Sequence, residues 1–468
     1  MEWAALFCLL VGLGVTIARA PLTWAVGLVV GLVAVGATLI RPALGVLLVV
    51  PAVPFGSLRQ VSLGAMNVGA TEVLVGLVVI AWLARMVARR EIRIEWPALS
   101  LPVAVFMGVL LLSTLGSASL PHSLKELIKW AEVLALLVLV STEIRGKWQR
   151  ALIVAVLGTG ALAALQGIYQ FLFQVGPESF VLFGRFMRAY GTFEQPNPFG
   201  GYLGLTLPIA FGVVVAAVWP SAQRARRRWL LLAAGCGGLM LAALVMTWSR
   251  GAWLGLAAAV GTMILTVVVR RGRAALWVTV LAMLVSYGLL AGGAARVPPS
   301  IVERFSDLVP FAGVTDVRGV EVTDANFAVV ERMAHWQAAL AMWTDHPWLG
   351  VGIGNYEVAY GEYALPLWSD PLGHAHNYYL NIAAESGVLG LAAYLLLWGT
   401  ALAVAWRATA SSAGWAWGIA LGILGALVHL AVHNLFDNLF VHGMYLQIAI
   451  LLGILSSLRK GTGDIEPN

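Results

Sequence analysis

Long apolar runs, separated by short polar loops, limit most strongly how this chain can fold. Runs of roughly 17 to 25 apolar residues are long enough to cross a bilayer as helices. Of the 468 residues, 60% are hydrophobic and 11% are charged. A globular protein of this size in water could not bury so much apolar surface, which excludes that class. The sequence therefore predicts an all-α, polytopic integral membrane protein.

We expect fourteen transmembrane helices, with twelve as the alternative because prolines interrupt or bound the first three apolar runs. The predicted spans are about 3–18, 22–40, 42–55, 70–84, 98–116, 125–141, 151–171, 198–219, 230–247, 251–269, 274–292, 378–404, 415–432 and 441–458. The first run lacks a basic start and a small-residue cleavage site, which favours a span over a removed signal peptide.

Basic residues fix the expected orientation. Clusters at 85–93, 145–150, 224–228 and 270–273 fall in every second loop. Positively charged loops stay in the cytoplasm. Both termini are therefore expected in the cytoplasm, and the segments 172–197 and 293–377 on the outer side.

The spans and loops divide the chain into four expected regions. Residues 1–171 form N-terminal transmembrane helices, and residues 172–292 add helices around a short outer loop and an SRG turn. Residues 293–377 form a long external loop, and residues 378–468 form the last transmembrane helices. Within the long loop, segment 327–344 has apolar positions at helical spacing, which predicts an amphipathic helix at the membrane interface.

Several chemistries are excluded by the motifs. Cys8 and Cys236 both lie in apolar runs without metal-type spacing, so disulfide and thiol chemistry are not expected. A GxGxG pattern occurs in 345–356, but no strand precedes it and no βαβ unit surrounds it, which excludes a dinucleotide fingerprint. No P-loop is present, which excludes an ATP-driven pump acting alone.

Outer arginines are the first candidate functional residues. Arg185 and Arg188 lie just before a predicted span, and Arg250 lies in the short outer turn TWSRGAW. Arginines at membrane depth are costly, and a guanidinium binds phosphate bidentately. One such arginine can be a snorkelling anchor or a helix cap. Three of them from separate outer segments indicate a lipid diphosphate as ligand.

Histidines at the end of the long loop are the second candidate group. His374 and His376 flank Ala375, and Asn377 opens the next helix. A neutral imidazole can take a proton from a hydroxyl, which favours His376 as a general base. A structural role for His374 is an equal alternative.

A metal site is the competing interpretation of the histidine pair. Zinc would need further ligands, which four other histidines could supply, namely His335, His346, His433 and His442. No outer carboxylate cluster is visible for Mg²⁺ or Mn²⁺. We therefore expect no metal and no cofactor. The outer turn 433–443 also carries Asp437, which could orient a base, although its spacing favours a polar turn.

Four of these stretches, in order, resemble the O-antigen ligase and Wzy-type polymerase superfamily of polytopic glycosyltransferases. They are RAYGTFEQPNPFGGYL, WSRGAWLGL, RMAHWQAALAMWTDHPWLGVGIGNY and HAHNYYLNIAAESGVLG, which run from Arg188 towards Asp437. The last fits a pattern of His-Asn, nine residues and GxxG.

The resemblance implies a lipid-dependent, GT-C-like architecture and an inverting, metal-independent transfer in lipopolysaccharide biosynthesis. A glycan would move from undecaprenyl diphosphate to an acceptor hydroxyl at the outer face of the bacterial cytoplasmic membrane. Arg188 and Arg250 would neutralise the diphosphate with help from Arg185, and His376 would activate the acceptor. His374 and Asn377 would shape the site, and Arg332 would line it from the loop.

Three alternatives remain at this point. The HN-x9-GxxG pattern favours a ligase, which transfers a finished chain to lipid A core, over a polymerase, which extends a lipid-linked chain. A flippase for the same lipid-linked sugars should carry polar residues through mid-span and show related halves. A membrane scaffold would not need the outer arginines and histidines. No nucleic-acid partner is expected.

Overall fold

A computed structural model describes residues 21–56, 60–63, 66–219, 226–272, 316–323 and 326–458. Two of the predicted spans, 3–18 and 274–292, lie outside the described residues. The helices of the described residues are α2 (Leu22–Ile40), α3 (Pro42–Phe55), α4 (Ala70–Arg89), α5 (Ser100–Ser113), α6 (Leu120–Glu143), α7 (Lys147–Leu172), α8 (Pro196–Val218), α9 (Arg226–Met246), α10 (Arg250–Arg271), α13 (Phe327–Asp345), α14 (Tyr356–Tyr363), α15 (Tyr378–Ser411), α16 (Gly414–His433) and α17 (Met444–Leu458).

The prediction of an all-α, polytopic membrane protein is confirmed. Seven of the described helices are long and apolar enough to cross a membrane, and they correspond to α4, α7, α8, α9, α10, α15 and α16. Four shorter apolar helices include α3 and α17. Helix α6 covers the predicted span 125–141 but is not among these, since its first half carries Lys125, Glu126, Lys129 and Glu132.

Two short antiparallel hairpins were not expected in a helical chain. Strands β1 (Gln60–Leu63) and β2 (Met66–Gly69) pair with Gln60 opposite Gly69. Strands β3 (Val181–Leu182) and β4 (Phe186–Met187) pair within segment 172–197. Both lie outside the candidate spans, so each is a local turn and not a sheet layer.

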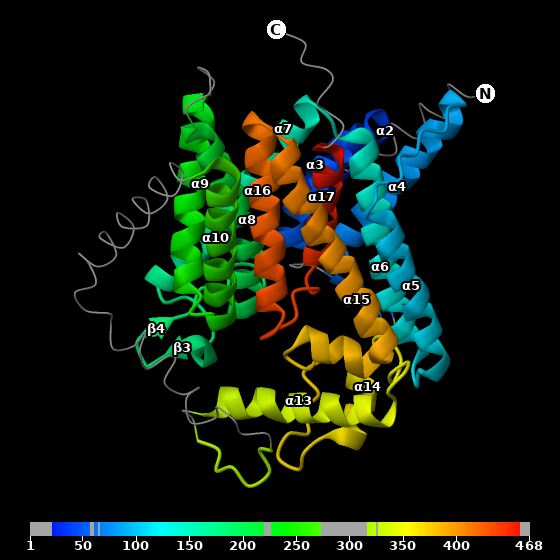
Figure 1. The fold of residues 1–468 in the computed structure, drawn as a ribbon, viewed down its shortest axis with the longest axis vertical. Coiled ribbons are helices and arrows are strands. Elements are labelled where there is room, and N and C mark those ends of the chain that lie inside the picture. The colour runs from blue at the N-terminus through cyan, green and yellow to red at the C-terminus, as the bar shows by residue number, and fades with distance from the viewer. Residues whose placement is uncertain are drawn as a thin grey trace.

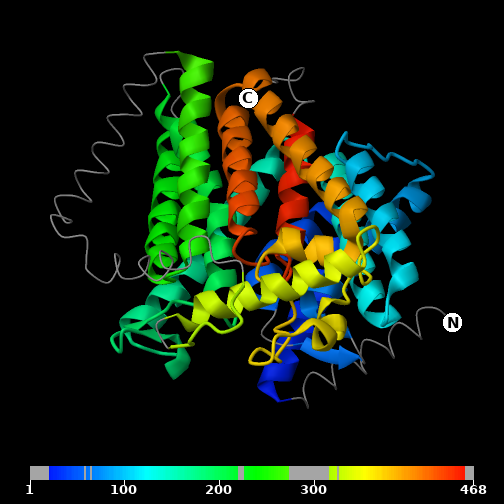
Figure 2. The same cartoon turned by 60° about the horizontal axis from the view of Figure 1, so that its bottom comes forward.

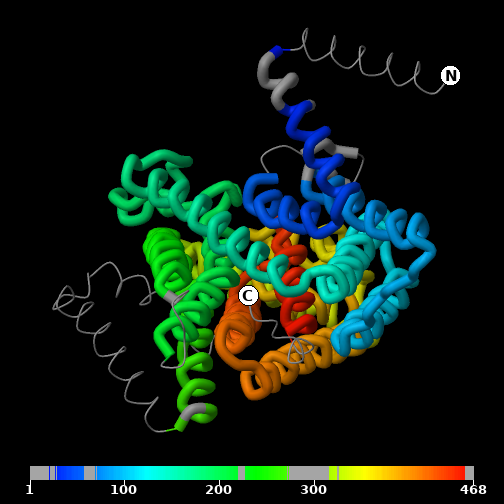
Figure 3. The backbone as a smooth tube through the Cα atoms, turned by 90° about the horizontal axis from the view of Figure 1, so that it is seen from above, coloured from blue at the N-terminus to red at the C-terminus, as the bar shows by residue number. Residues whose placement is uncertain are grey.

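The helices pack most tightly around α8, α16 and α17. Glycines allow this approach, because a side chain at Gly212 of α8 would overlap the Gly418 carbonyl of α16. Most residues of α8 and α16 and nearly all of α17 are buried. Figure 3 shows α17 near the middle of the bundle, with the other helices around it.

Helix α13 lies across one end of the bundle, roughly perpendicular to the long helices (Figures 1 and 2). It covers the predicted amphipathic segment 327–344, whose helical structure is confirmed. Its place at a membrane interface remains a prediction.

The described clusters of basic residues lie at one end of the bundle, and α13 lies at the other. The first turn of α6 bonds to the loop before α14, since Ser123 Oγ donates to the Ile353 carbonyl over 2.7 Å. The other end of α6, at Glu143, lies opposite α13 and near the arginines of 85–93 and 145–150. Arg270, at the end of α10, likewise donates to the Trp406 carbonyl near the end of α15. The described basic clusters thus share the end remote from α13, as the expected orientation requires.

Candidate functional site

The segment carrying Arg188 and the turn carrying Arg250 lie side by side. Arg188 Nε donates to the Thr247 carbonyl over 2.8 Å, and its Nη2 donates to Asn197 Oδ1 over 2.8 Å. The neighbouring Ala189 N–H donates to the Met246 carbonyl over 2.9 Å. The end of α9 and the start of α8 therefore hold the Arg188 guanidinium beside the turn that leads into α10.

Arg250 is the first residue of α10 and is only 8% exposed. Ser249 caps the helix, and its Oγ accepts from the Ala252 N–H over 3.4 Å. The free N–H groups at a helix start attract anions and disfavour cations. A buried arginine at this position is costly by itself and adds to the attraction for an anion.

Arg185 lies on the β3–β4 hairpin, which packs on the turn before Arg250, since the Phe186 and Trp248 ring centres are 5.4 Å apart. It sits in the exposed turn between β3 and β4, where its guanidinium lies 5.1 Å from the centre of the Phe186 ring. Its described side-chain contact is thus with an aromatic ring of the same hairpin. The assisting role predicted for Arg185 remains untested.

The loop that carries the histidines is fixed by hydrogen bonds to its backbone. The Ala375 N–H donates to Asn381 Oδ1 over 3.0 Å, and the Tyr378 N–H donates to the Asn434 carbonyl over 2.8 Å. Asn377 caps α15, because its Oδ1 accepts from the Tyr379 N–H over 3.0 Å. These bonds hold His376 in a left-handed backbone conformation, with φ of 51°.

Asp437 faces both histidines. Its Oδ1 lies 3.8 Å from His374 Nε2 and 4.0 Å from His376 Nδ1, and the residue is almost fully buried. The same oxygen accepts from the Asn438 N–H over 2.8 Å, which is the polar turn that its spacing favoured. The sequence allowed Asp437 either to orient a base or to form a polar turn. The structure is compatible with both roles.

Burial favours the neutral form of both imidazoles. It lowers the pKa of His374, although the Asp437 charge acts in the opposite direction. It also lowers the pKa of His376 well below its usual value, with further lowering by His374, Arg332 and His335. Neither ring nitrogen of His376 hydrogen-bonds within the described residues. A neutral imidazole with an uncommitted nitrogen is suited to accept a proton.

Helix α13 brings Arg332 and His335 to this group. The Arg332 charge acts on the pKa of both His374 and His376. The His335 ring lies edge-on to His376, 5.6 Å between centres, and its Nδ1 lies 3.0 Å from the Tyr356 hydroxyl. Burial lowers the pKa of His335 to about 4. The contact of His335 with His376 has no signal in local sequence, since it depends on how α13 crosses the bundle.

The arginine pair and the histidine group meet through the end of α16. A side chain at Gly251, next to Arg250, would lie 2.8 Å from His433 Cδ2 and 3.3 Å from Phe436 Cβ. Asp437 follows directly in the same turn. The start of α10 therefore packs on the turn that presents Asp437 to His374 and His376.

His374, His376 and Asp437 could also hold a metal ion. Each offers one ligand atom, and these atoms lie within 4.8 Å of one another. Two imidazoles and a carboxylate are a suitable donor set for zinc. Of the histidines considered as additional ligands, His335 and His433 contact other residues, since His433 Nδ1 lies 3.3 Å from His429 Nε2. The expectation of a metal-free site remains a prediction.

The glycines of the GxGxG pattern serve packing. Gly350, Gly352 and Gly354 all have positive φ, and a side chain at Gly354 would lie 2.6 Å from the His122 carbonyl oxygen. Asn355 then joins this loop to the start of α6, because its Oδ1 accepts from the Ser119 N–H over 2.7 Å. The loop wedges between α6 and α15, which supports the exclusion of a nucleotide fingerprint.

Residues 236–395 match the sequence model of a family described as O-Antigen ligase. The match includes Arg250, Arg332, His374 and His376, and Arg188 precedes it. No match was found among curated proteins. The family match confirms the predicted resemblance over this part of the chain and supports a membrane enzyme of the O-antigen ligase or polymerase type.

Proposed function

We propose, starting from this resemblance to the O-antigen ligase family, that the chain transfers a glycan from undecaprenyl diphosphate to an acceptor hydroxyl. The reaction would take place at the outer face of the bacterial cytoplasmic membrane. The observation that carries the proposal is the packing of the Arg250 end of α10 on the turn of Asp437, which faces His376.

The two arginines would act on the leaving group. As the bond between the anomeric carbon and the diphosphate oxygen breaks, that oxygen takes the electron pair. Arg188 and Arg250 would neutralise the resulting diphosphate, a task that needs fixed positive charge and no proton donor. The bonds of Arg188 to Thr247 and Asn197 hold it in position before the donor arrives.

His376 would act on the acceptor. Its neutral ring would take the proton as the acceptor oxygen attacks the anomeric carbon, and direct attack inverts that centre. Asp437, 4.0 Å from His376 Nδ1, would then stabilise the imidazolium. His374 and Asn377 would shape this side of the site, Arg332 would line it from α13, and Arg185 would assist with the donor.

Transfer to lipid A core, as in a ligase, is the first proposal for the acceptor. The sequence pattern His376-Asn377, nine residues, Gly387-Val388-Leu389-Gly390 favours it. A polymerase would use the same residues with a second lipid-linked chain as acceptor.

Purified protein in detergent, given synthetic undecaprenyl-diphosphate oligosaccharide without nucleotide, tests the proposal. A single transferred chain that forms only when lipid A core is added would support a ligase. A ladder of longer lipid-linked chains without core would identify a polymerase. Absence of both products would contradict the transferase and favour a flippase, which a lipid-translocation assay in vesicles would detect.

A further inference from the structure

A cavity of about 340 Å³ lies at the end of the bundle remote from the histidines. Its walls come from the last turns of α4, the segment 91–95 and the turn between α6 and α7. Its lining includes Trp82, Arg85, Arg89 and three glutamates, Glu91, Glu95 and Glu143. The proposed transfer reaction uses none of these residues.

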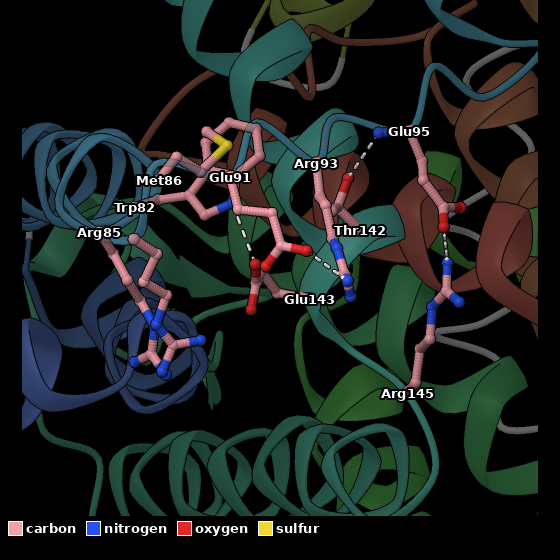
Figure 4. A pocket seen from close by; sticks show the side chains of 10 residues that line it. Trp82, Arg85, Met86, Glu91, Arg93, Glu95, Thr142, Glu143 and Arg145 are labelled. Carbon is pink, nitrogen blue, oxygen red and sulfur yellow. Dashed lines mark hydrogen bonds and ion pairs between the residues drawn. The ribbon is translucent and has the colours of Figure 1, made fainter.

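The acidic residues of the cavity already have partners. Glu91 pairs with Arg93, Glu95 pairs with Arg145, and Glu143 Oε1 accepts from the Trp82 indole N–H over 3.2 Å. Figure 4 shows Arg85 on one side of the cavity, the Glu95–Arg145 pair on the other, and Glu91 and Glu143 between them. The acids are thus occupied with groups of the wall.

Two arginines keep donors available for a ligand. Arg85 is half-buried and uses Nη1 for the Ile40 carbonyl over 2.5 Å. Arg89 makes no ion pair or hydrogen bond within the part of the chain that the structure describes. Guanidinium groups one helical turn apart on α4 can converge on one phosphate, which each binds through two N–H groups.

Exposed apolar side chains flank the segment that forms one wall of the cavity. Ile92, which is 81% exposed, lies between the lining residues Glu91 and Arg93. Trp96, which is 68% exposed, lies just beyond the cavity in the loop after α4, where an indole anchors at a membrane surface. A ligand with a phosphate head and apolar tails matches both the cavity and these side chains.

We propose that this cavity binds the phosphate group of an anionic phospholipid. Arginines are expected at this end because basic residues are common in cytoplasmic loops. That rule does not explain a cavity in which the glutamates have partners in the wall while Arg85 and Arg89 keep donors available. Basic pockets at helix ends are known to hold lipid head groups. The site is independent of the proposed transfer reaction.

Native mass spectrometry of the full chain in detergent tests the site, with phosphatidylglycerol and phosphatidylcholine offered at equal concentration. We expect preferential retention of phosphatidylglycerol. The double variant Arg85→Gln/Arg89→Gln should lose it by roughly fivefold for each arginine, as expected for a basic residue at an anionic membrane surface. Glycerol phosphate at the same concentration should not displace it, because it lacks the acyl chains.

Arg407→Gln is the matched control, since Arg407 is exposed at the same end of the bundle but lies outside the cavity. It should retain the lipid as the wild type does. Equal retention of both lipids, undiminished binding in the double variant or an equal loss in Arg407→Gln would overturn the proposal. Full displacement by glycerol phosphate would assign the site to a free phosphate ester. Should the double variant not fold, the exposed Arg89→Gln alone decides.

Discussion

Arg250 combines two unfavourable placements, burial and the first turn of a helix. A guanidinium at the start of a helix adds its charge to the N–H groups there, and the two together attract an anion. Thr247 and Asn197 hold Arg188 against the turn that leads to Arg250, so the two arginines stand on segments that pack together. Such a pair suits a diphosphate.

Replacement of Arg188 or Arg250 by alanine should lower the transfer rate by at least about 100-fold, the usual cost of losing one donor to developing negative charge. Product formation from the synthetic lipid-linked oligosaccharide measures it. Arg318→Ala is the control, since Arg318 is exposed and pairs with Asp316 in the outer loop. Wild-type rates in either variant, with normal insertion into the membrane, would contradict the diphosphate role.

The pH dependence follows from the lowered pKa of His376. A base with an ordinary histidine pKa is half protonated near pH 6.5 and loses activity there. Because burial disfavours the protonated ring, His376 stays neutral to lower pH. We expect kcat/KM to be constant from pH 8 to 6.5 and to fall only at more acidic pH. An activity that halves between pH 6.5 and 7 would argue against this residue as the base.

Transfer should survive excess EDTA if the arginines, and not a metal ion, neutralise the diphosphate. His374, His376 and Asp437 provide the structural reason to measure it, since they could hold an ion. Assays of the purified protein before and after chelation give the answer. Activity that is lost and then restored by Zn²⁺ or Mn²⁺ would make this group a metal site.

At the scale of elements, the kink of α15 shapes the histidine end. Gly387 has φ of 64° inside the helix, and a side chain there would overlap the Trp348 carbonyl group. The Val388 N–H, freed by the kink, donates to the Pro347 carbonyl over 2.8 Å. The segment from α13 to α14 is thus anchored at the kink, one short helical stretch away from His376.

Gly387→Ala should destabilise the protein by more than about 2 kcal/mol, because strain at positive φ adds to the overlap. Thermal unfolding in detergent, followed by tryptophan fluorescence, measures the loss, and transfer activity should fall with it. Gly399→Ala is the matched control in the same helix, where nothing lies within 4 Å of the added carbon. Equal melting temperatures for both variants would show that the kink does not need glycine.

Sequence patterns predicted these elements unequally. Continuous apolar runs located α7, α8 and α10 within a few residues, and apolar positions at helical spacing located α13. These patterns did not predict the hairpins, α14 or the kink at Gly387, since these depend on contacts between distant segments. The GxGxG glycines show the same limit: their spacing is local, but what they pack against is on α6 and α15.

At the scale of the molecule, the two ends of the bundle have separate chemistry. Motif order predicted that Arg188, Arg250 and His376 share one end, and the described helices place them there. From the sequence, Asp437 could either orient a histidine or form a polar turn. The sequence could not decide between them, because the contact with the histidines requires the end of α16 to meet the start of α15. The basic residues at the other end were explained by membrane orientation alone, so their sequence pattern did not predict the cavity that they line.

The two ends should face opposite sides of the membrane. In a background with Cys8 and Cys236 replaced by serine, Ser369→Cys should react with an impermeant maleimide added outside intact spheroplasts. Ser411→Cys should react only after the membrane is opened. Ser369 is exposed near the histidines, and Ser411 is exposed at the other end of α15. The reverse labelling would invert the orientation and place the transfer site in the cytoplasm.

The left-handed backbone of His376 bears on why a histidine is found at this position. A non-glycine residue at φ of 51° costs about 1 kcal/mol, and glycine would remove most of that cost. The bonds of Ala375, Asn377 and Tyr378 force the conformation on whichever residue stands there. An imidazole kept at this cost is what the proposed role of His376 predicts, and seven other non-glycine residues of the described chain also have positive φ.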